Sequence, residues 1–494
     1  DEAFIRLALM SQKLGKKVFI VVEKLDELAL IDKVAKELGV QPNIGLRIKL
    51  VSEGQGRWSS STGEYSKFGL NTMELMEALE IAKSKNILDC VKLIHFHLGS
   101  QITNIRRIKD SLKEVGRFYS ELMKFGCNIQ YIDVGGGLGI DYDGSRSTFA
   151  SSTNYSVQEY ANDVVYHLLE ICKAEDLPHP NIISESGRAM TAHHSILVVN
   201  VLDVTTFPEW SEQIEIADDA PEVVKEVFDV LDSTSNKNLI ESWHDAVHLK
   251  DEAQNQFLLG LISLTDRAMA ERIYWGICRK IEKLSSRLKF LPDDIRNLRT
   301  KLADKYFCNF SVFQSVPDSW AIDQVFPVVP LNRLHEEPDR DATIADITCD
   351  SDGRIDTFIG THRGTENTLR VHSLQPGESY CLCIFLTGAY QEILGDLHNL
   401  FGDTNTVHVS LKEDGSLNYE QIIEGEDVTD VLDYVQFSAD ELAGRIDGFL
   451  IGCVQRGVVT QKEADDFIAL YKAGLDGYTY LVKPEAPDEG SGFS

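Results

Sequence analysis

Three short polar motifs, each directly after a run of apolar residues, contain the residue types in this sequence that could do chemistry. They are HFHLGSQ (95–101), DVGGGLG (133–139) and SESGRAM (184–190). Polar residues at the carboxyl ends of successive parallel strands converge on one mouth of a barrel. We therefore expect the three motifs to form a single site.

The glycine turn, defined as Gly135, Gly136 and Gly137, ends the second motif. Residues without side chains let backbone N–H groups approach and cradle a phosphate. A tight strand–helix turn is the ordinary alternative, but three consecutive glycines exceed what such a turn needs. The GxxxxGK[ST] layout is absent, which disfavours a nucleoside triphosphate loop. The pattern therefore favours a phosphate site.

His95 and His97 are two residues apart on a predicted strand, so they face the same side of the sheet. They could bind a metal, place an imidazole against a planar cofactor, or form a hydrogen-bonded pair in the core. Gly99 and Ser100 follow at the strand end and suit a second phosphate contact.

Glu185 stands at a predicted strand end, and Arg188 follows three residues later. A carboxylate beside a ring nitrogen keeps that nitrogen protonated, and an arginine pairs with phosphate. Alone, the two residues would be explained equally well as a structural ion pair. Together with the glycine turn and a histidine, they indicate a pyridine ring that bears a phosphate, which is pyridoxal 5′-phosphate.

A fourth motif, TCDSDGRID (348–356), places Cys349 beside Asp350 and Asp352. It offers a thiol as proton donor and two carboxylates for a cationic group. DSDG is also an ordinary turn sequence. A calcium loop is disfavoured, because no glutamate follows at the required distance.

Alternating β-branched runs and amphipathic segments from residue 17 to about 203 predict a parallel sheet covered by helices. The strand-end motifs favour a TIM-type (β/α)8 barrel over a doubly wound sheet. Only five strands are evident where a closed barrel needs eight, and open edges must be covered. We expect about three βα units to precede Asp1 and to be absent from this chain.

The changing pattern along the chain predicts an α/β part followed by a β part, with helical additions. The predicted divisions are a pyridoxal-phosphate-binding barrel (1–205), a helical insertion (206–305), an antiparallel β domain with the CDSDG motif (306–427), a C-terminal helical region (428–483) and a disordered tail (484–494).

The composition limits the compartment and the partners. The chain has 494 residues, 43% of them hydrophobic, with 48 Lys and Arg against 78 Asp and Glu, a net charge of −30. Such a surface repels nucleic acids and anionic membranes. Nine scattered cysteines without zinc spacing predict a reducing cytoplasm.

The ordered motifs resemble those of the pyridoxal-phosphate decarboxylases with the alanine racemase-like fold, and among these most closely the large biosynthetic arginine decarboxylases. The likeness runs nearly end to end and includes the helical insertion. Its segments are GQGRWSSSTGEYSKFGL (54–70), LIHFHLGSQITNIR (93–106), DVGGGLGIDYDG (133–144), ESGRAMTAHH (185–194), NFSVFQSVPDSWAIDQVFPVVPL (309–331), ITCDSDGRID (347–356) and GAYQEILGDLHNLFGD (388–403).

The resemblance implies a role for each matching residue. His97 would stack on the cofactor ring, and Glu185 would pair with the pyridine nitrogen. The phosphate would be held by Ser100, Gly135, Gly136, Gly137, Arg188 and Tyr390. Cys349 would protonate the substrate carbon after carbon dioxide leaves, and Asp350, to which we add Asp352, would bind the distal cation.

The same resemblance implies decarboxylation of L-arginine to agmatine, a first step toward polyamines such as putrescine and spermidine. It also implies an obligate homo-oligomer in which Cys349 reaches the partner subunit's site. Magnesium is a family requirement for which the sequence shows no ligand set. The family's Schiff-base lysine lies in a segment like YPIKVNQ, which does not occur here, and Lys49 and Lys67 belong to other family motifs. We expect this chain to be a fragment that cannot form that covalent link.

Three other functions stay open on the sequence alone. One is decarboxylation of another basic amino acid: ornithine, lysine or diaminopimelate. Another is a catalytically inactive regulatory protein, which the missing lysine favours. A metal-dependent barrel hydrolase using His95 and His97 would leave Glu185, Arg188 and the glycine turn unexplained.

Overall fold

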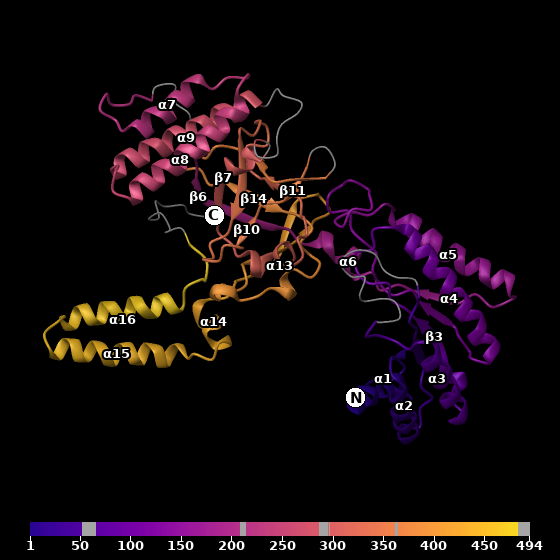
Figure 1. Cartoon of the computed structure of the whole chain (residues 1–494). Coiled ribbons are helices and arrows are strands. Elements are labelled where there is room, and N and C mark those ends of the chain that lie inside the picture. The colour runs from indigo at the N-terminus through magenta and orange to yellow at the C-terminus, as the bar shows by residue number, and fades with distance from the viewer. Residues whose placement is uncertain (52–65, 208–213, 286–294, 296, 361–363, 483–494) are drawn as a thin grey trace.

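The computed structural model describes residues 1–51, 66–207, 214–285, 295, 297–360 and 364–482. The predicted disordered tail (484–494) and residues 54–65 of the first family segment lie outside the described residues. Figure 1 shows the first part of the chain, in indigo and purple, beside a central β-sheet part from which two groups of helices extend.

A five-stranded parallel sheet forms the N-terminal part, and its strands follow one another in sequence order. The strands are β1 (Ile20–Val22), β2 (Ile44–Arg47), β3 (Val91–His95), β4 (Tyr131–Asp133) and β5 (Asn181–Ile183). The accompanying helices are α1 (Glu2–Lys13), α2 (Leu25–Leu38), α3 (Thr72–Ser84), the short η2 (Leu88–Cys90), α4 (Ile105–Phe125) and α5 (Val157–Ala174). Sequential parallel strands joined by helices are the arrangement of a (β/α)8 barrel wall.

Helix α4 illustrates how the sequence specifies these elements. Its N-cap residue Asn104 accepts a hydrogen bond from the Arg106 N–H, and Gly126 ends it in the left-handed conformation. Between the caps, one stripe of residues three or four apart is buried: Ile105, Ile108, Leu112, Val115, Tyr119 and Leu122. Such spacing gives a helix one apolar face, which packs against the sheet.

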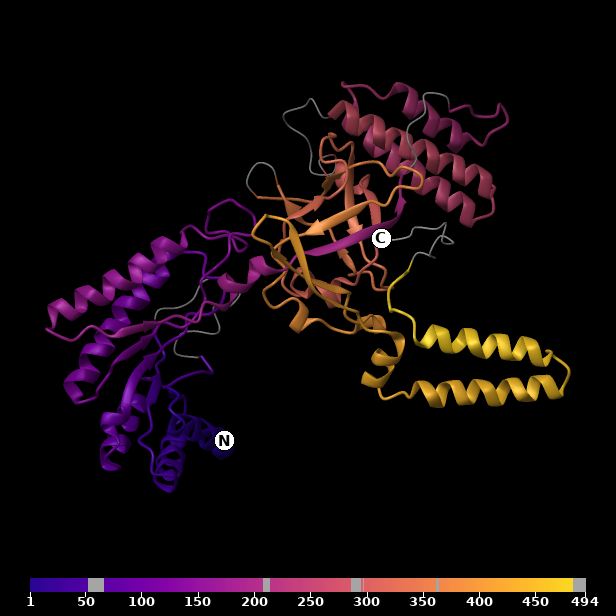
Figure 2. The ribbon, with the colours of Figure 1, turned by 180° about the vertical axis from the view of Figure 1, so that it is seen from behind.

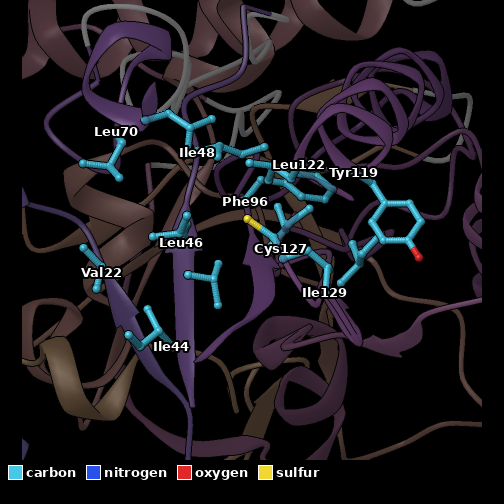
Figure 3. Close-up of a cluster of buried hydrophobic side chains, with 14 of the residues drawn as sticks. Val22, Ile44, Leu46, Ile48, Leu70, Phe96, Tyr119, Leu122, Cys127 and Ile129 are labelled. Carbon is cyan, nitrogen blue, oxygen red and sulfur yellow. The ribbon is translucent and has the colours of Figure 1, made fainter. Parts of the chain in front are cut away.

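The core of this part joins the strands to the inner faces of the helices. Figure 3 shows side chains from the strands, among them Val22, Ile44 and Leu46, together with Tyr119 from α4. The Tyr119 hydroxyl donates a 2.7 Å hydrogen bond to the Pro178 carbonyl, so its polar end has a partner at the edge of the core. The packing holds the carboxyl ends of the strands in a common layer.

A second sheet of seven strands occupies the middle of the molecule. Its strands are β6 (Leu197–Thr205), β7 (Asp304–Cys308), β8 (Val328–Pro330), β9 (Arg340–Ala345), β10 (Arg354–Ile355), β13 (Leu369–Val371) and β14 (Cys381–Ile384). All pairings are antiparallel except that of β7 with β9. Strand β6 lies within 1–205 but pairs with β7 and β14, so it belongs to this sheet.

Short elements surround the second sheet. They are α6 (Gly187–Thr191), η3 (Ala192–His194), α12 (Val312–Ser315), α13 (Pro317–Ala321), the pair β11 (Phe358–Ile359) and β12 (Thr365–Glu366), η4 (Glu392–Leu394) and η5 (His398–Leu400). Several of them carry residues of the family motifs.

Two helical groups extend from the central sheet (Figure 1). The first is a bundle with its own buried core, made of α7 (Glu222–Ser233), α8 (Leu239–Leu258) and α9 (Leu264–Ser285), followed by α11 (Leu298–Lys301). The second follows the hairpin β15 (Thr406–Leu411) and β16 (Leu417–Ile423) and consists of α14 (Val428–Tyr434), α15 (Ala439–Gln455) and α16 (Gln461–Leu475). Helices α15 and α16 lie side by side and project away from the sheet in both views (Figure 2). Within the described residues, no helix combines the length and apolar character needed to cross a bilayer.

Truncation of the central strand β4 should destabilise the first part. Ile132 is fully buried and lies in register with Ile94 and Ile182 on the neighbouring strands. We expect Ile132→Ala to lower the free energy of unfolding by about 2–5 kcal/mol, because it leaves a cavity. Urea unfolding followed by circular dichroism measures this, with the half-exposed Ile182→Ala as control. Equal losses in the two variants would contradict the packing described here.

Candidate active site

The carboxyl ends of β3, β4 and β5 bring the three polar motifs together. His95 and Asp133 are register partners on adjacent strands, and Glu185 lies two residues beyond Ile183, the partner of Asp133 on β5. Because side chains alternate along a strand, register partners and residues two apart share a face of the sheet. One ligand atom from each of His95, Asp133 and Glu185 lies within 4.8 Å of the others.

Asp133 and His95 form a buried pair at the centre of this group. The Asp133 Oδ2 atom lies 2.9 Å from His95 Nδ1, and its Oδ1 accepts a 2.9 Å hydrogen bond from the Gly135 N–H. Burial alone would raise the pKa of Asp133, but its contacts with His95 and with the Gly135 N–H outweigh that effect and lower it. Asp133 is therefore a charged group at the base of the site.

Glu185 is more exposed than His95 and Asp133, and its surroundings shift its pKa in the direction opposite to that of Asp133. Its N–H donates a 2.9 Å hydrogen bond to the Gly135 carbonyl, which ties the end of β5 to the glycine turn. Burial of the carboxyl raises its pKa, and the neighbouring Asp133 charge raises it further. Two close carboxyl groups thus have pKa values pushed in opposite directions.

The glycine turn packs against the end of β3 too closely for side chains. Gly135 and Gly137 have φ values of +65° and +97°. A Cβ on Gly135 would lie 2.2 Å from the Phe96 carbonyl oxygen, and one on Gly137 would lie 2.6 Å from the Gly99 carbonyl oxygen. Glycine is required here both by backbone conformation and by the close approach. This is the backbone surface that a phosphate-binding turn presents.

His97 lies against the same turn. Its Nδ1 accepts a 2.9 Å hydrogen bond from the Gly99 N–H, so the proton of the neutral ring resides on Nε2. A Cβ on Gly136 would lie 3.3 Å from that Nε2 atom. Burial lowers the pKa of His97, and the positive charge of Arg47 lowers it further. The ring is therefore a neutral, planar group at neutral pH.

Arg188 is buried and gathers residues from three motifs. Its Nη1 donates a 2.8 Å hydrogen bond to the Tyr142 hydroxyl, and its Nη2 donates a 3.1 Å hydrogen bond to the Ser100 Oγ. The guanidinium carbon also lies 4.8 Å from the centre of the Tyr390 ring. Tyr390 itself has a φ of +70°, a strained conformation for a residue with a side chain. A buried guanidinium beside a hydroxyl and a glycine turn can hold a phosphate.

The GAYQ segment reaches Arg188 because it packs closely on the last residue of α6. A Cβ on Gly388 would lie 2.0 Å from the Thr191 carbonyl oxygen, so glycine is needed there. Gln391 then holds the segment, since its Nε2 donates a 2.8 Å hydrogen bond to Asp318 on α13. Two parts of the chain about two hundred residues apart thus form one wall of the site.

The CDSDG loop belongs to the central sheet part. Beneath it, the buried Asp346 accepts hydrogen bonds from the N–H groups of Val312 and Thr348, and burial raises its pKa. Cys349 is exposed. The Asp350 Oδ1 accepts the Asp352 N–H at 2.9 Å, and its Oδ2 lies 3.0 Å from His398 Nε2. Asp352 is exposed at the turn.

The structure thus brings most of the sequence-predicted site residues into two groups. The first group contains His97, Ser100, the glycine turn, Glu185, Arg188 and Tyr390, and the second contains Cys349, Asp350 and Asp352. Sequence reasoning missed four supporting residues: Gln101, Asp133, Tyr142 and His398. The buried Gln101 exchanges hydrogen bonds of 2.7 and 2.9 Å with the backbone of Ile140. Gln101 could have been predicted to support the site from the sequence, because it directly follows the HLGS motif.

The first group fits pyridoxal phosphate. It combines a backbone cradle that tolerates no Cβ, a buried guanidinium, a neutral imidazole plane and a carboxyl group, which are the donor types that this cofactor needs. With parallel strands of a barrel wall, these features are those of a pyridoxal-phosphate-binding enzyme.

Comparison with known proteins agrees with this class. A family described as "Pyridoxal-dependent decarboxylase, pyridoxal binding domain" matches residues 1–192. "Arginine decarboxylase helical bundle domain" matches 217–299, and "Arginine decarboxylase C-terminal helical extension" matches 428–481. These matches cover the barrel part and both helical groups.

Curated relatives and a solved structure show which family of pyridoxal-dependent decarboxylases this chain resembles. The biosynthetic arginine decarboxylase of Bacteroides thetaiotaomicron is 54% identical over 97% of this chain and 76% of its own length. That of Rhodopirellula baltica is 45% identical with the same coverage. The crystal structure of the Campylobacter jejuni enzyme has a TM-score of 0.83 at 33% identity, over 98% of this chain and 77% of that one. This chain belongs to the biosynthetic arginine decarboxylase family.

A more distant structure agrees in fold alone. Diaminopimelate decarboxylase from Helicobacter pylori has a TM-score of 0.53 at 16% identity, over 88% of this chain and 76% of that one. The predicted fold class, a pyridoxal-phosphate-binding barrel with a helical insertion, a β domain and terminal helices, is confirmed. The predicted cofactor is confirmed by the family.

Replacement of Gly135 should weaken cofactor binding. We expect Gly135→Ala to reduce pyridoxal phosphate affinity by at least about tenfold, because the new Cβ must displace the end of β3. Gly144→Ala is the matched control, since Gly144 has a φ of +69° but no atom within 4 Å of its Cβ position. Fluorescence titration with the cofactor measures both, and equal losses would show that backbone conformation alone matters.

Proposed function

We propose that this protein is a carboxy-lyase that decarboxylates L-arginine to agmatine and carbon dioxide with pyridoxal phosphate. The observation that carries the proposal is the assembly of Arg188, His97, Glu185 and the glycine turn in a chain 54% identical to a biosynthetic arginine decarboxylase. The product would enter a route to polyamines, as the biosynthetic name of the relatives suggests.

The first group of residues would hold the cofactor, which when bound supplies an electron-accepting ring for the electron pair left by the departing carboxylate. Arg188, Ser100, Tyr390 and the glycine turn would bind the phosphate. His97 would lie against one face of the ring, and its lowered pKa keeps it uncharged there. Glu185 would accept a hydrogen bond from the protonated ring nitrogen.

The second group would act on the substrate. Asp350 is held from two sides, by the Asp352 N–H and by His398, which leaves its carboxylate in a defined position for a guanidinium. Asp352 would provide a second carboxylate. The Cys349 thiol would deliver a proton to the substrate carbon after decarboxylation.

We further propose a homo-oligomer in which Cys349 serves the partner subunit's site. Support comes from the fold, because Cys349 lies in the loop before β10 of the central sheet, whereas Glu185 lies at the end of β5. A cytoplasmic location is also proposed, on the ground that all nine cysteines are unpaired.

Magnesium finds little support in the donor chemistry. Within the described part of the chain, the group of three potential ligands is His95, Asp133 and Glu185. Magnesium prefers six oxygen ligands in octahedral geometry, and this group offers an imidazole and a carboxyl with a raised pKa. No step is therefore assigned to a metal. The family match, rather than the ligand chemistry, disfavours a metal-dependent hydrolase.

Substrate choice tests the proposed function directly. Carbon dioxide release from arginine, ornithine, lysine and diaminopimelate should be compared with the purified enzyme. We expect kcat/KM for arginine to exceed the others by at least about a hundredfold, since carboxylates placed to pair with a planar guanidinium are left partly unpaired by the shorter or differently shaped ammonium groups of the other amino acids. A preference for ornithine or diaminopimelate would contradict the proposal, and no turnover at all would indicate a regulatory protein.

Mixing two inactive variants tests the shared site. Glu185→Ala and Cys349→Ala should each lower kcat by at least about a hundredfold, because each removes a group needed for ring or proton chemistry. If each site combines both subunits, random exchange in a dimer restores about a quarter of the sites. Activity after co-refolding measures this, with each variant refolded alone as control. Failure to recover activity would place both residues in one subunit's site.

A further inference from the structure

None of the family roles considered above is assigned to Asp133. It belongs to the group formed by His95, Asp133 and Glu185, and its side chain is both buried and held at its two oxygens. It is 5% exposed, and both oxygens have contacts: Oδ1 with the Gly135 N–H and Oδ2 with His95 Nδ1, each at 2.9 Å. A buried carboxylate is costly unless it is paired, so these contacts hold both its charge and its orientation.

The same contacts fix the orientation of the Asp133 carboxylate. Its oxygens are turned toward backbone and imidazole, and it lies one strand nearer the middle of the sheet than Glu185. Glu185 is exposed, and its carboxyl lies within 4.8 Å of the ligand atoms of Asp133 and His95. Asp133 thus places a second carboxylate beside that of Glu185.

We infer that Asp133, held by His95 and the Gly135 N–H, is a positioning residue that strengthens the hold of Glu185 on a protonated ring nitrogen. The inference rests on the proposed role of Glu185. A cation at Glu185 interacts with both carboxylates, and in a partly buried site the second, more distant charge adds to the attraction of the first. Loss of Asp133 would therefore lower the basicity of the bound ring nitrogen.

The pKa directions agree with this arrangement. Burial and the Asp133 charge raise the pKa of Glu185. Without a ligand cation, the pair of carboxyls therefore retains a proton more readily than an isolated glutamate would. A protonated ring nitrogen would take the place of that proton, leaving both carboxylates charged. Other groups that surround the pair come from β2, β3 and α5, namely Arg47, His95, His97 and Tyr160.

The alternative is that Asp133 and His95 only stabilise the sheet. Asp133→Asn separates the two possibilities, because asparagine keeps the size and a hydrogen-bond acceptor while it removes the charge. In the cofactor-free protein, carboxyl ¹³C NMR of labelled glutamate should show the Glu185 midpoint about one pH unit lower than in the wild type. The Glu185 signal is identified by its absence in Glu185→Gln.

Two further variants complete the experiment. Asp133→Glu keeps the charge and should leave the Glu185 midpoint raised. Asp32→Asn is the matched control, since Asp32 is also 5% exposed but lies on helix α2, where it pairs with Lys36 and with Lys85 at the end of α3. It should cost stability without moving the Glu185 midpoint. An unchanged midpoint in Asp133→Asn would overturn the inference.

The cofactor-loaded enzyme distinguishes this inference from the proposed function. The pH at which the absorbance of bound cofactor changes should fall in both Glu185→Gln and Asp133→Asn, and kcat should fall about tenfold in Asp133→Asn with KM for arginine nearly unchanged. If Glu185→Gln alone shifts the absorbance, Asp133 has only a structural role. If neither shifts it, the proposed role of Glu185 fails, whatever the substrate.

Discussion

The close approach of the glycine turn to the end of β3 is the constraint on which the rest of the site depends. Gly135 lies so near the Phe96 carbonyl that no side chain fits between them. This contact brings the N–H of Gly135 to Asp133 and its carbonyl to the N–H of Glu185. Backbone packing therefore fixes the glycine turn relative to the carboxyl groups of Asp133 and Glu185.

Charge is distributed around this cradle in an ordered way. Arg188 is buried beside Ser100, whereas the carboxyls of Asp133 and Glu185 form a separate group with His95. Between them His97 is kept neutral by burial and by the nearby Arg47 charge. A ring with an anionic phosphate and a cationic nitrogen matches this polarity, since each end meets the opposite charge.

The strand-end motifs could be predicted to converge because parallel strands present their carboxyl ends at one edge. His97, Glu185 and Arg188 were identified in this way, and Tyr390 followed from a family motif. Asp133 and Tyr142 were not identified, because an aspartate at a strand end and a tyrosine in a loop have many possible roles. Likewise, β6 could not be assigned to the central sheet from the sequence, since its partners β7 and β14 lie more than a hundred residues later.

The sequence by itself determined the barrel-type repeat of strands and helices, the family and the chemical types of the cofactor site, because these depend on local periodicity and on short motifs. Only the tertiary structure decided which side chains meet. Register between β3 and β4 places His95 beside Asp133, and the packing of Gly388 on Thr191 brings Tyr390 over Arg188. Such contacts join residues distant in sequence, and they arise from how whole elements pack rather than from any local pattern.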